Sequence, residues 1–174
     1  VRCWGAGYYN GLGTGELSAP STAIPVSVLM PVPAKKVETV QDTSCAHGED
    51  GKVYCWGFTA STKNLPAGPT PTVQVDGELF DDILTGPSVR CGVSNFGTNL
   101  RGIRCWGSNG SGELASGVAG GVSAVPVSVS GLEDLLTGAV GGSSTASHVC
   151  VISGDGKANG PTRCWGANAS LESG

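Results

Sequence analysis

The sequence feature that most constrains the fold is a Cys-Trp-Gly triplet that occurs four times in 174 residues. The triplets begin at Cys3, Cys55, Cys105 and Cys164. They contain every tryptophan of the chain, which are Trp4, Trp56, Trp106 and Trp165. Consecutive tryptophans are 52, 50 and 59 residues apart. Such regular self-similarity predicts a protein built of repeats.

Each repeat is expected to be a small β-sheet. The chain has 29 Gly and 10 Pro but only 14% charged residues, which favours short strands and tight turns. We predict an all-β fold of about three and a half four-stranded blades, a partial or open β-propeller. The predicted repeats are 1–57, 58–107 and 108–166, with the start of a further repeat at 167–174, all within one domain covering 1–174.

Two weaker marks recur in the same repeat. Pro25, Pro71 and Pro126 each precede an alternating run, so each is expected to be the first residue of a strand, where a missing N–H costs no ladder hydrogen bond. Gly-Glu-Leu also follows the first and third triplets, at residues 15–17 and 112–114. These are interpreted as equivalent loop positions.

The repeat assigns six of the seven cysteines to pairs. The pairs are Cys45–Cys55, Cys91–Cys105 and Cys150–Cys164. A three-residue hairpin loop centred on Asp50, with Gly51 in the left-handed conformation, would place the first two cysteines directly opposite each other. Opposed residues on antiparallel strands lie roughly 4.5 to 5.5 Å apart at Cα, which a disulfide tolerates.

Free buried thiols and a zinc site are the competing interpretations of these cysteines. The spacings lack paired CxxC motifs, and only His47 and His148 could assist, so we expect no metal and no cofactor. Lasting disulfides indicate an oxidising compartment, and the protein is predicted to be secreted or on a cell surface.

Cys3 is left without a partner. Either the segment begins inside a longer protein or a neighbouring chain provides the strand opposite it, so the missing blades would be supplied in cis or by another chain. In both cases a truncated hairpin leaves an unpaired sheet edge.

Charge and hydropathy exclude two classes of partner. The net charge is −4, the pI is near 5.0 and no Lys/Arg cluster is present, which argues against nucleic acid. No stretch approaches the roughly 20 apolar residues that a membrane span needs. The chain opens at Val1 without a signal-peptide pattern and is interpreted as a mature or internal segment.

No enzyme motif is expected to be functional. Residues 11–15 are glycine-rich but lack the Lys followed by Ser/Thr that contacts phosphate and metal in a phosphate loop, and neither histidine has an evident nucleophile and orienting acid. The four tryptophans are interpreted as repeat core, with ligand stacking as the alternative. Asn109 and Asn168 begin glycosylation sequons at equivalent places after two triplets.

The segments DTSCAHGEDGKVYCWG (42–57), SHVCVISGDGKANGPTRCWG (147–166) and VPVSVSGL (125–132) resemble the repeat of the regulator of chromosome condensation (RCC) family, in particular its secreted and bacterial-type cysteine-bearing copies. The resemblance implies propeller blades. It also implies, as an alternative function, guanine nucleotide exchange on a small GTPase, although no residue here matches an exchange site.

The sequence thus favours a non-catalytic extracellular propeller segment that binds a protein or glycan partner. A structural role is the second hypothesis, in which open ends add further copies of the chain into a fibre or surface appendage. Exchange activity is the third.

Overall fold

The computed structural model is built almost wholly of strands. It describes residues 1–17, 19–57, 68–94, 102–132, 139–144, 148–153 and 161–167. The strands are β1 (Arg2–Gly5), β2 (Thr22–Ser27), β3 (Ala34–Val40), β4 (Thr43–Gly48), β5 (Val53–Gly57), β6 (Thr72–Val73), β7 (Asp82–Thr85), β8 (Val89–Ser94), β9 (Gly102–Ser108), β10 (Val122–Ser128), β11 (Ala139–Ser144), β12 (His148–Ser153) and β13 (Thr162–Gly166). A single 3-10 turn, η1 (Tyr8–Asn10), accompanies them in this described part. Within it, no helix has the length and apolar character that crossing a bilayer demands.

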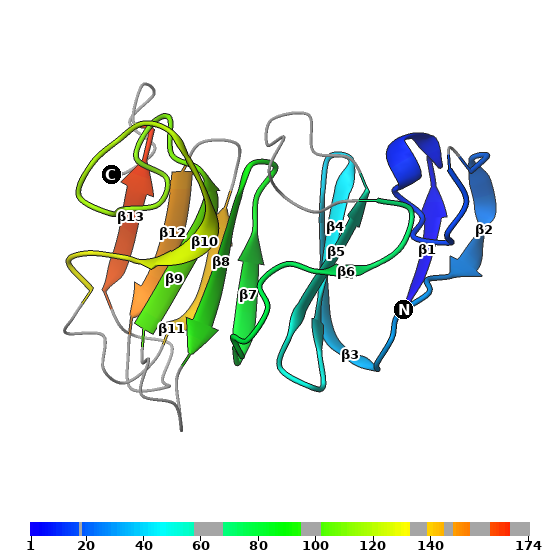
Figure 1. Cartoon of the computed structure of the whole chain (residues 1–174), viewed down its shortest axis with the longest axis horizontal. Helices are drawn as coiled ribbons and strands as arrows, with labels where there is room; N and C mark the ends of the chain where they lie inside the picture. Colours follow the sequence, from blue (N-terminus) through cyan, green and yellow to red (C-terminus); the bar gives the residue numbers. More distant parts are fainter. Residues whose placement is uncertain are drawn as a thin grey trace. The chain divides into compact units, whose positions relative to one another are not determined.

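The described strands form four antiparallel sheets in which sequence neighbours pair (Figure 1). Two sheets have four strands, β3-β4-β5-β6 and β7-β8-β9-β10. The other two are β1-β2 and β11-β12-β13. A four-stranded antiparallel meander is the blade of a propeller. The predicted all-β fold of propeller blades is confirmed.

The chain divides into two compact units, Val1–Leu79 and Phe80–Gly174. Each unit contains two of the sheets. The boundaries of the sheets differ from those of the predicted repeats. Each predicted repeat ends at a triplet, but the strand that follows the triplet pairs with the triplet strand and so belongs to the same sheet. The single domain over 1–174 stays a prediction, and the two units are described separately.

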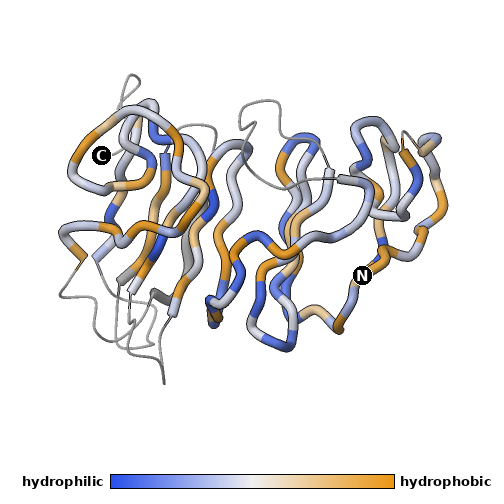
Figure 2. Tube along the Cα trace, viewed as in Figure 1, coloured by the Kyte–Doolittle hydropathy of each residue, from blue (hydrophilic) through white to orange (hydrophobic). Residues whose placement is uncertain are grey.

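Apolar side chains from neighbouring sheets form the core of each unit. In the second unit the core comprises Leu84, Val89, Cys91, Val93, Ile103, Cys105, Leu114, Val129, Leu132, Val149 and Val151. In the first unit Val28, Ala46 and Trp56 are buried, and Cys3 packs against them. Each fully buried Val, Leu or Ile side chain stabilises the fold by about 1.5–3 kcal/mol, because it is removed from water. Figure 2 shows the hydrophilic loop that joins β4 to β5 beyond this core.

Two prolines lie inside strands, which corrects the prediction that each opens one. Pro25 is within β2 and Pro126 within β10, whereas Pro71 does directly precede β6. The pairing register shifts between Cys3 and Gly5 opposite β2, and between Ser123 and Val127 in β10. A bulge on an outer strand leaves the position without a ladder bond, so the missing proline N–H is tolerated there.

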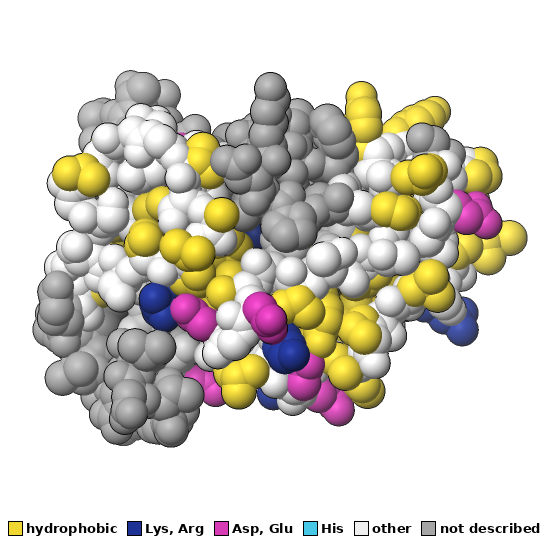
Figure 3. Space-filling model, viewed as in Figure 1, with side chains coloured by type: hydrophobic (Ala, Val, Ile, Leu, Met, Phe, Trp, Pro, Cys, Tyr) yellow, Lys and Arg dark blue, Asp and Glu magenta, His cyan; other side chains and the backbone are white. Residues whose placement is uncertain are grey.

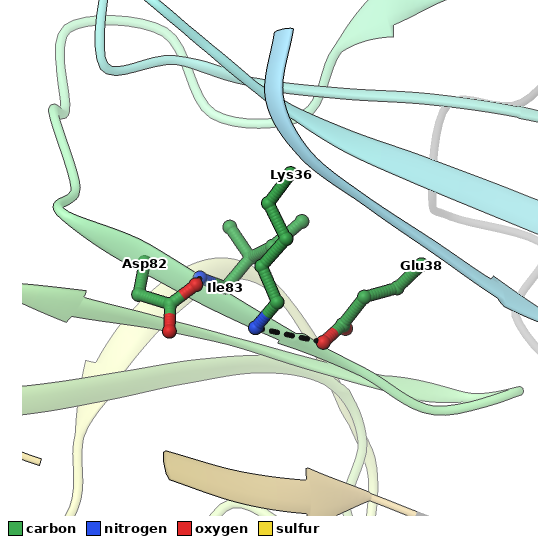
Figure 4. A network of polar contacts seen from close by, with 4 residues as sticks. All are labelled: Lys36, Glu38, Asp82 and Ile83. Carbon is green, nitrogen blue, oxygen red and sulfur yellow. Dashed lines mark hydrogen bonds and ion pairs between the residues drawn. The ribbon is translucent and has the colours of Figure 1, made fainter. Parts of the chain in front are cut away.

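Strand β3 shows the alternation expected of a strand with one covered face, since its residues are alternately exposed and half-buried. Lys36 and Glu38, two residues apart on the same face of β3, form an ion pair with Nζ 2.9 Å from Oε1 (Figure 4). Partly exposed pairs of this kind contribute about 0–1 kcal/mol. In β7, the side chain of Asp82 accepts a hydrogen bond from the amide of Ile83.

Candidate functional site

Three disulfides each join two adjacent strands of one sheet, which are the middle strands β4–β5 and β8–β9 of the four-stranded sheets and β12–β13 of the three-stranded sheet. They link Cys45 to Cys55, Cys91 to Cys105 and Cys150 to Cys164. In each pair the two cysteines are direct register partners, and their Cα atoms are 4.1 Å apart. Each bond therefore lies across one rung of an antiparallel ladder, the position in which neighbouring Cα atoms come closest.

The hairpin between the first two cysteines has the three-residue loop that the sequence predicts. The amide of Gly48 donates to the carbonyl of Lys52 (2.9 Å), the amide of Gly51 donates back to the carbonyl of Gly48 (3.0 Å), and Gly51 has φ +81°. The left-handed glycine turns the chain so that β4 and β5 leave the loop in register.

An acid and a phenol from this hairpin form a close pair. The hydroxyl of Tyr54 donates to Oδ2 of Asp50 at 2.6 Å. Burial, reinforced by the neighbouring carboxylate, raises the pKa of Tyr54 to about 12. Partial desolvation raises the pKa of Asp50, but the hydrogen bonds from Tyr54 and Lys52 and the charge of Lys52 outweigh it, so that pKa lies below its ordinary value.

The tryptophans occupy two kinds of environment. Trp56 and Trp106 are fully buried and Trp165 is half-buried, in line with a core role. The ring of Trp106 stacks on Phe80 with centroids 5.6 Å apart. Trp4 contradicts the core prediction, because 65% of its surface is exposed. Trp56 and Trp106 are covered by neighbouring residues, whereas no segment that the structure describes covers Trp4 in the same way.

Two of the triplet tryptophans make the same kind of hydrogen bond through the indole nitrogen. Nε1 of Trp56 donates to the carbonyl of Gly11 at 3.0 Å, and Nε1 of Trp165 donates to the carbonyl of Glu113 at 2.8 Å. Both acceptors lie eight residues after the cysteine of the preceding triplet. The triplet of one repeat is thereby tied to the loop of the repeat before it.

These hydrogen bonds correct the register of the Gly-Glu-Leu marks. Leu114 is only 2% exposed, whereas Leu17 is 77% exposed. The buried equivalent of Leu114 is Leu12, which stands nine residues after its own cysteine as Leu114 does. Counting from the cysteines would have found this equivalence, but the repeated letters Gly-Glu-Leu suggested another.

Asn109 uses its side chain to hold its own loop together. Its Nδ2 donates to the carbonyls of Val118 (2.8 Å) and Gly120 (3.4 Å), and its Oδ1 accepts from the amide of Leu114 (3.0 Å). The side chain is buried, so the folded loop does not present to solvent the nitrogen that would carry a glycan. Asn168, the other sequon, lies outside the described residues.

No metal site is found in the described part of the chain, since no group of three or more His, Cys, Asp or Glu side chains is placed to hold an ion. His47 is buried in β4 and His148 begins β12. The glycine-rich run 11–15 is a turn, in which the amide of Gly13 donates to the carbonyl of Asn10.

Cys3 is the free cysteine of the chain, and it lies on a strand with one open edge. β1 pairs with β2, where Cys3 is opposite Val26, and no described strand pairs with its other edge. Partial burial raises the pKa of the Cys3 thiol above its ordinary value. The thiol is thus kept mostly protonated at neutral pH.

A groove of about 480 Å³ lies beside β1 in the first unit. Its wall includes Arg2, Cys3, Trp4 and Tyr8 from one side of the groove and Val37 and Thr39 from β3. Figure 3 shows hydrophobic side chains at the surface of this unit. The groove therefore combines exposed aromatic rings, a thiol and a free strand edge, which is chemistry suited to binding.

Solved structures similar to this chain are propellers. Human WBSCR16 aligns with a TM-score of 0.68 at 20% identity, and Prp20p from Saccharomyces cerevisiae, the yeast RCC1, with 0.71 at 16%. The CRINKLY WD40 ectodomain of the Arabidopsis thaliana receptor kinase ACR4 aligns with 0.50 at 16%. The alignments cover 94%, 97% and 82% of this chain.

This chain spans about two fifths of the length of each of those proteins, at 41%, 41% and 40%. No family model matches the sequence. At these identities the likeness concerns the fold alone, and it agrees with the fold that the RCC resemblance implied. The chain has an RCC1-type propeller fold.

Proposed function

We propose that this chain is an extracellular, non-catalytic segment of a β-propeller that binds a protein or glycan partner. The observation that carries the proposal is the set of three disulfides, each across two adjacent strands of one sheet. Disulfides persist outside the reducing cytosol. Four of the six disulfide-bonded cysteines are fully buried, namely Cys45, Cys55, Cys91 and Cys105, which protects their bonds from soluble thiols.

Rigid blades with exposed loops and grooves are suited to recognition. The groove beside β1 contains the exposed side chains of Trp4 and Tyr8. Both residue types are enriched in protein–protein interfaces. The likeness to the ectodomain of ACR4 supports such a setting, because that propeller belongs to a receptor. An open sheet edge also permits further copies of the chain to add head to tail. In that case the protein would be a structural subunit of a fibre or surface appendage.

Guanine nucleotide exchange is the second candidate. It is favoured by the likeness to Prp20p, whose structure was described with its binding to Gsp1p and histones. The disulfides and the net charge of −4 weigh against a role on chromatin in a reducing nucleus. A nucleotide-release assay with the complete parent protein separates the two functions.

The compartment is tested by counting thiols. The native protein is isolated from its source with iodoacetamide present, denatured, and measured by intact mass before and after reduction. We expect at most one alkylated cysteine before reduction, namely Cys3, and all seven after it. Seven alkylated cysteines before reduction would show a reducing environment and overturn the extracellular assignment.

A further inference from the structure

The loop that follows β1 has a counterpart elsewhere in the chain. Residues 7–15, here called the first loop, and residues 109–117, the third loop, lie at the same distance from the cysteines of their triplets. Leu12 in the first loop and Leu114 in the third occupy the same position, and they are 3% and 2% exposed. The same buried leucine therefore anchors both loops to the protein.

The backbone of the two loops is alike as well. Asn10 and Gly13 of the first loop have φ of +65° and +64°. Their counterparts in the third loop, Gly112 and Ala115, have φ of +84° and +46°. The carbonyls of Gly13 and Ala115 both accept a hydrogen bond from the second amide after the outer strand of the sheet, at 3.0 and 2.9 Å. The third loop therefore shows which features of the first loop belong to the common fold.

The two loops differ at the tip. The first loop has Tyr8 and Tyr9 there, and they are 69% and 52% exposed. The third loop has Gly110 and Ser111, which are exposed as well, although β8 pairs with β9 in that sheet. An exposed tip is thus a property of the loop even where the strand before the triplet is in place.

Tyr9 has a strained backbone conformation. Its φ of +58° and ψ of +25° lie in the left-handed region, which is unusual for a bulky residue because the Cβ crowds the backbone there. Ser111, at the same position of the third loop, has no positive φ. The first loop thus holds an aromatic side chain at its tip in a conformation that glycine adopts without strain. Strain of this kind clusters at sites that contact a ligand.

The chemistry of the tip fits a protein partner. Residues 3–15 contain no charged side chain. Tyrosine, glycine and asparagine are enriched in the binding loops of antibodies, where tyrosine supplies a large contact area and loses little conformational entropy. Sites for small molecules are concave and enclose the ligand, whereas a tight turn with two exposed rings is convex. The complement of such a tip is an uncharged pocket on a folded protein.

We propose that Tyr8 and Tyr9 insert into an uncharged pocket on a folded protein partner, with the first loop as their rigid support. The inference rests on the proposed binding function, for which it names the contact residues and the class of partner. The third loop is the matched control, because it has the same anchors and no aromatic ring at its tip.

The partner is sought by photo-cross-linking with the full-length protein. The photoreactive amino acid p-benzoylphenylalanine replaces Tyr9 in one variant and Ser111 in the control, and each variant is illuminated with intact cells of its source. We expect a protein adduct from position 9 that mass spectrometry identifies and that position 111 does not give. The same adducts from both positions, or none from position 9, would overturn the inference.

The cross-linked protein is then purified and used as the probe in a binding titration. Y8S/Y9S should weaken its affinity by about tenfold or more, as the loss of a central aromatic contact does. G110A/S111A should change the affinity by less than about twofold, and the chain tolerates it because a Cβ at Gly110 meets only ordinary contacts. Equal affinities of the Y8S/Y9S variant and the unsubstituted protein would contradict the contact.

Two further measurements separate other causes. Y9G should melt at or above the temperature of the unsubstituted protein, because glycine relieves the left-handed strain. A fall of several degrees would show that the ring belongs to the fold and would overturn its role as a contact. Binding that disappears when glycans are removed enzymatically from the probe would assign a glycan ligand in place of a protein pocket. The thiol count of the native protein tests the extracellular assignment independently of all these results.

Discussion

The indole Nε1 of Trp56 donates a 3.0 Å hydrogen bond to the carbonyl oxygen of Gly11, 45 residues earlier in the chain. The same bond recurs between Trp165 and Glu113, which are 52 residues apart. A tryptophan in one repeat thus satisfies a loop carbonyl of the preceding repeat, while its ring fills the core. In these two copies the bond joins one repeat to the repeat before it.

Replacing Trp56 with Phe should destabilise the protein by about 1–3 kcal/mol, because the substitution leaves the Gly11 carbonyl without its donor and removes buried ring atoms. The measurement is the free energy of unfolding from urea titration. W4F is the matched control at the same triplet position. It should change stability by less than about 0.5 kcal/mol, because Trp4 is exposed. Equal losses in the two variants would contradict the packing role assigned to Trp56.

Substituting the triplet glycines should have unequal effects. Gly5 and Gly107 have similar positive φ, so alanine is strained at both, but only at Gly107 would the new Cβ overlap a neighbouring carbonyl. We expect G5A to lower the free energy of unfolding by about 1–2 kcal/mol and G107A by clearly more. If thermal or urea unfolding finds the same loss for both, a strand already covers the edge of β1.

Removing the second disulfide by the double substitution C91A/C105A should lower the free energy of unfolding by about 2–4 kcal/mol, since the bond closes a loop whose ends are 14 residues apart. C3A is the control, with an expected loss below about 1 kcal/mol because its sulfur is unbonded. Urea unfolding in non-reducing buffer measures both. A larger loss from C3A than from the double variant would be incompatible with the assigned pairing.

The Tyr54–Asp50 pair predicts a loss of stability in alkali. The pKa of Tyr54 is raised from 10.0 to about 12 in the folded protein, so the folded state holds the phenol proton more tightly than the unfolded chain. The contribution is complete below pH 10 and is lost as the pH rises through about 12. Tyrosinate absorbance should show one late-titrating tyrosine, which Y54F removes. An ordinary midpoint for Tyr54 would refute the pairing.

The same pair also predicts a loss of stability in acid, through the carboxyl of Asp50. The folded-state pKa of Asp50 is lowered, so its contribution is present above the ordinary value of 3.8 and is lost as the pH falls through the folded pKa. D50N should therefore flatten the acid side of the stability profile, measured as thermal midpoint against pH, relative to the unsubstituted protein. An unchanged acid limb would contradict the role given to this carboxyl.

Asn109 should be structural and unglycosylated in the folded protein. N109D replaces the Nδ2 donor with an acceptor facing two carbonyls, so we expect a loss of about 1–3 kcal/mol in the free energy of unfolding. S111A removes the same sequon without touching that side chain and should be nearly neutral. Peptide mass spectrometry of the native protein checks occupancy. A glycan found at Asn109 would contradict the buried amide.

Much of the fold could be predicted from the sequence, because the signals are periodic. The triplet sets the repeat, and the three-residue loop at Gly51 fixes the register that brings Cys45 opposite Cys55. The Pro25 and Pro126 placements could not be predicted, because a bulge on an outer strand depends on its partner strand. The exposure of Trp4 was missed for a similar reason, since identical triplets do not reveal which copy lacks a neighbour.

The candidate site was predicted only in part. The leftover Cys3 pointed to an open edge, but the groove also depends on β3, which places Val37 and Thr39 opposite it. Those residues carry no motif, so only their position in the sheet identifies them. The loop roles of Leu12 and Asn109 were likewise hidden, because repeated letters at 15–17 and a sequon at 109 suggested other interpretations.

Disulfide mapping of the native protein tests the central claim most directly. Peptides from a non-reduced digest are sequenced by mass spectrometry to establish which cysteines are joined. We predict the links Cys45–Cys55, Cys91–Cys105 and Cys150–Cys164, with Cys3 outside all three links. A link between Cys3 and any of those six residues, or cysteines joined across different sheets, would contradict the account.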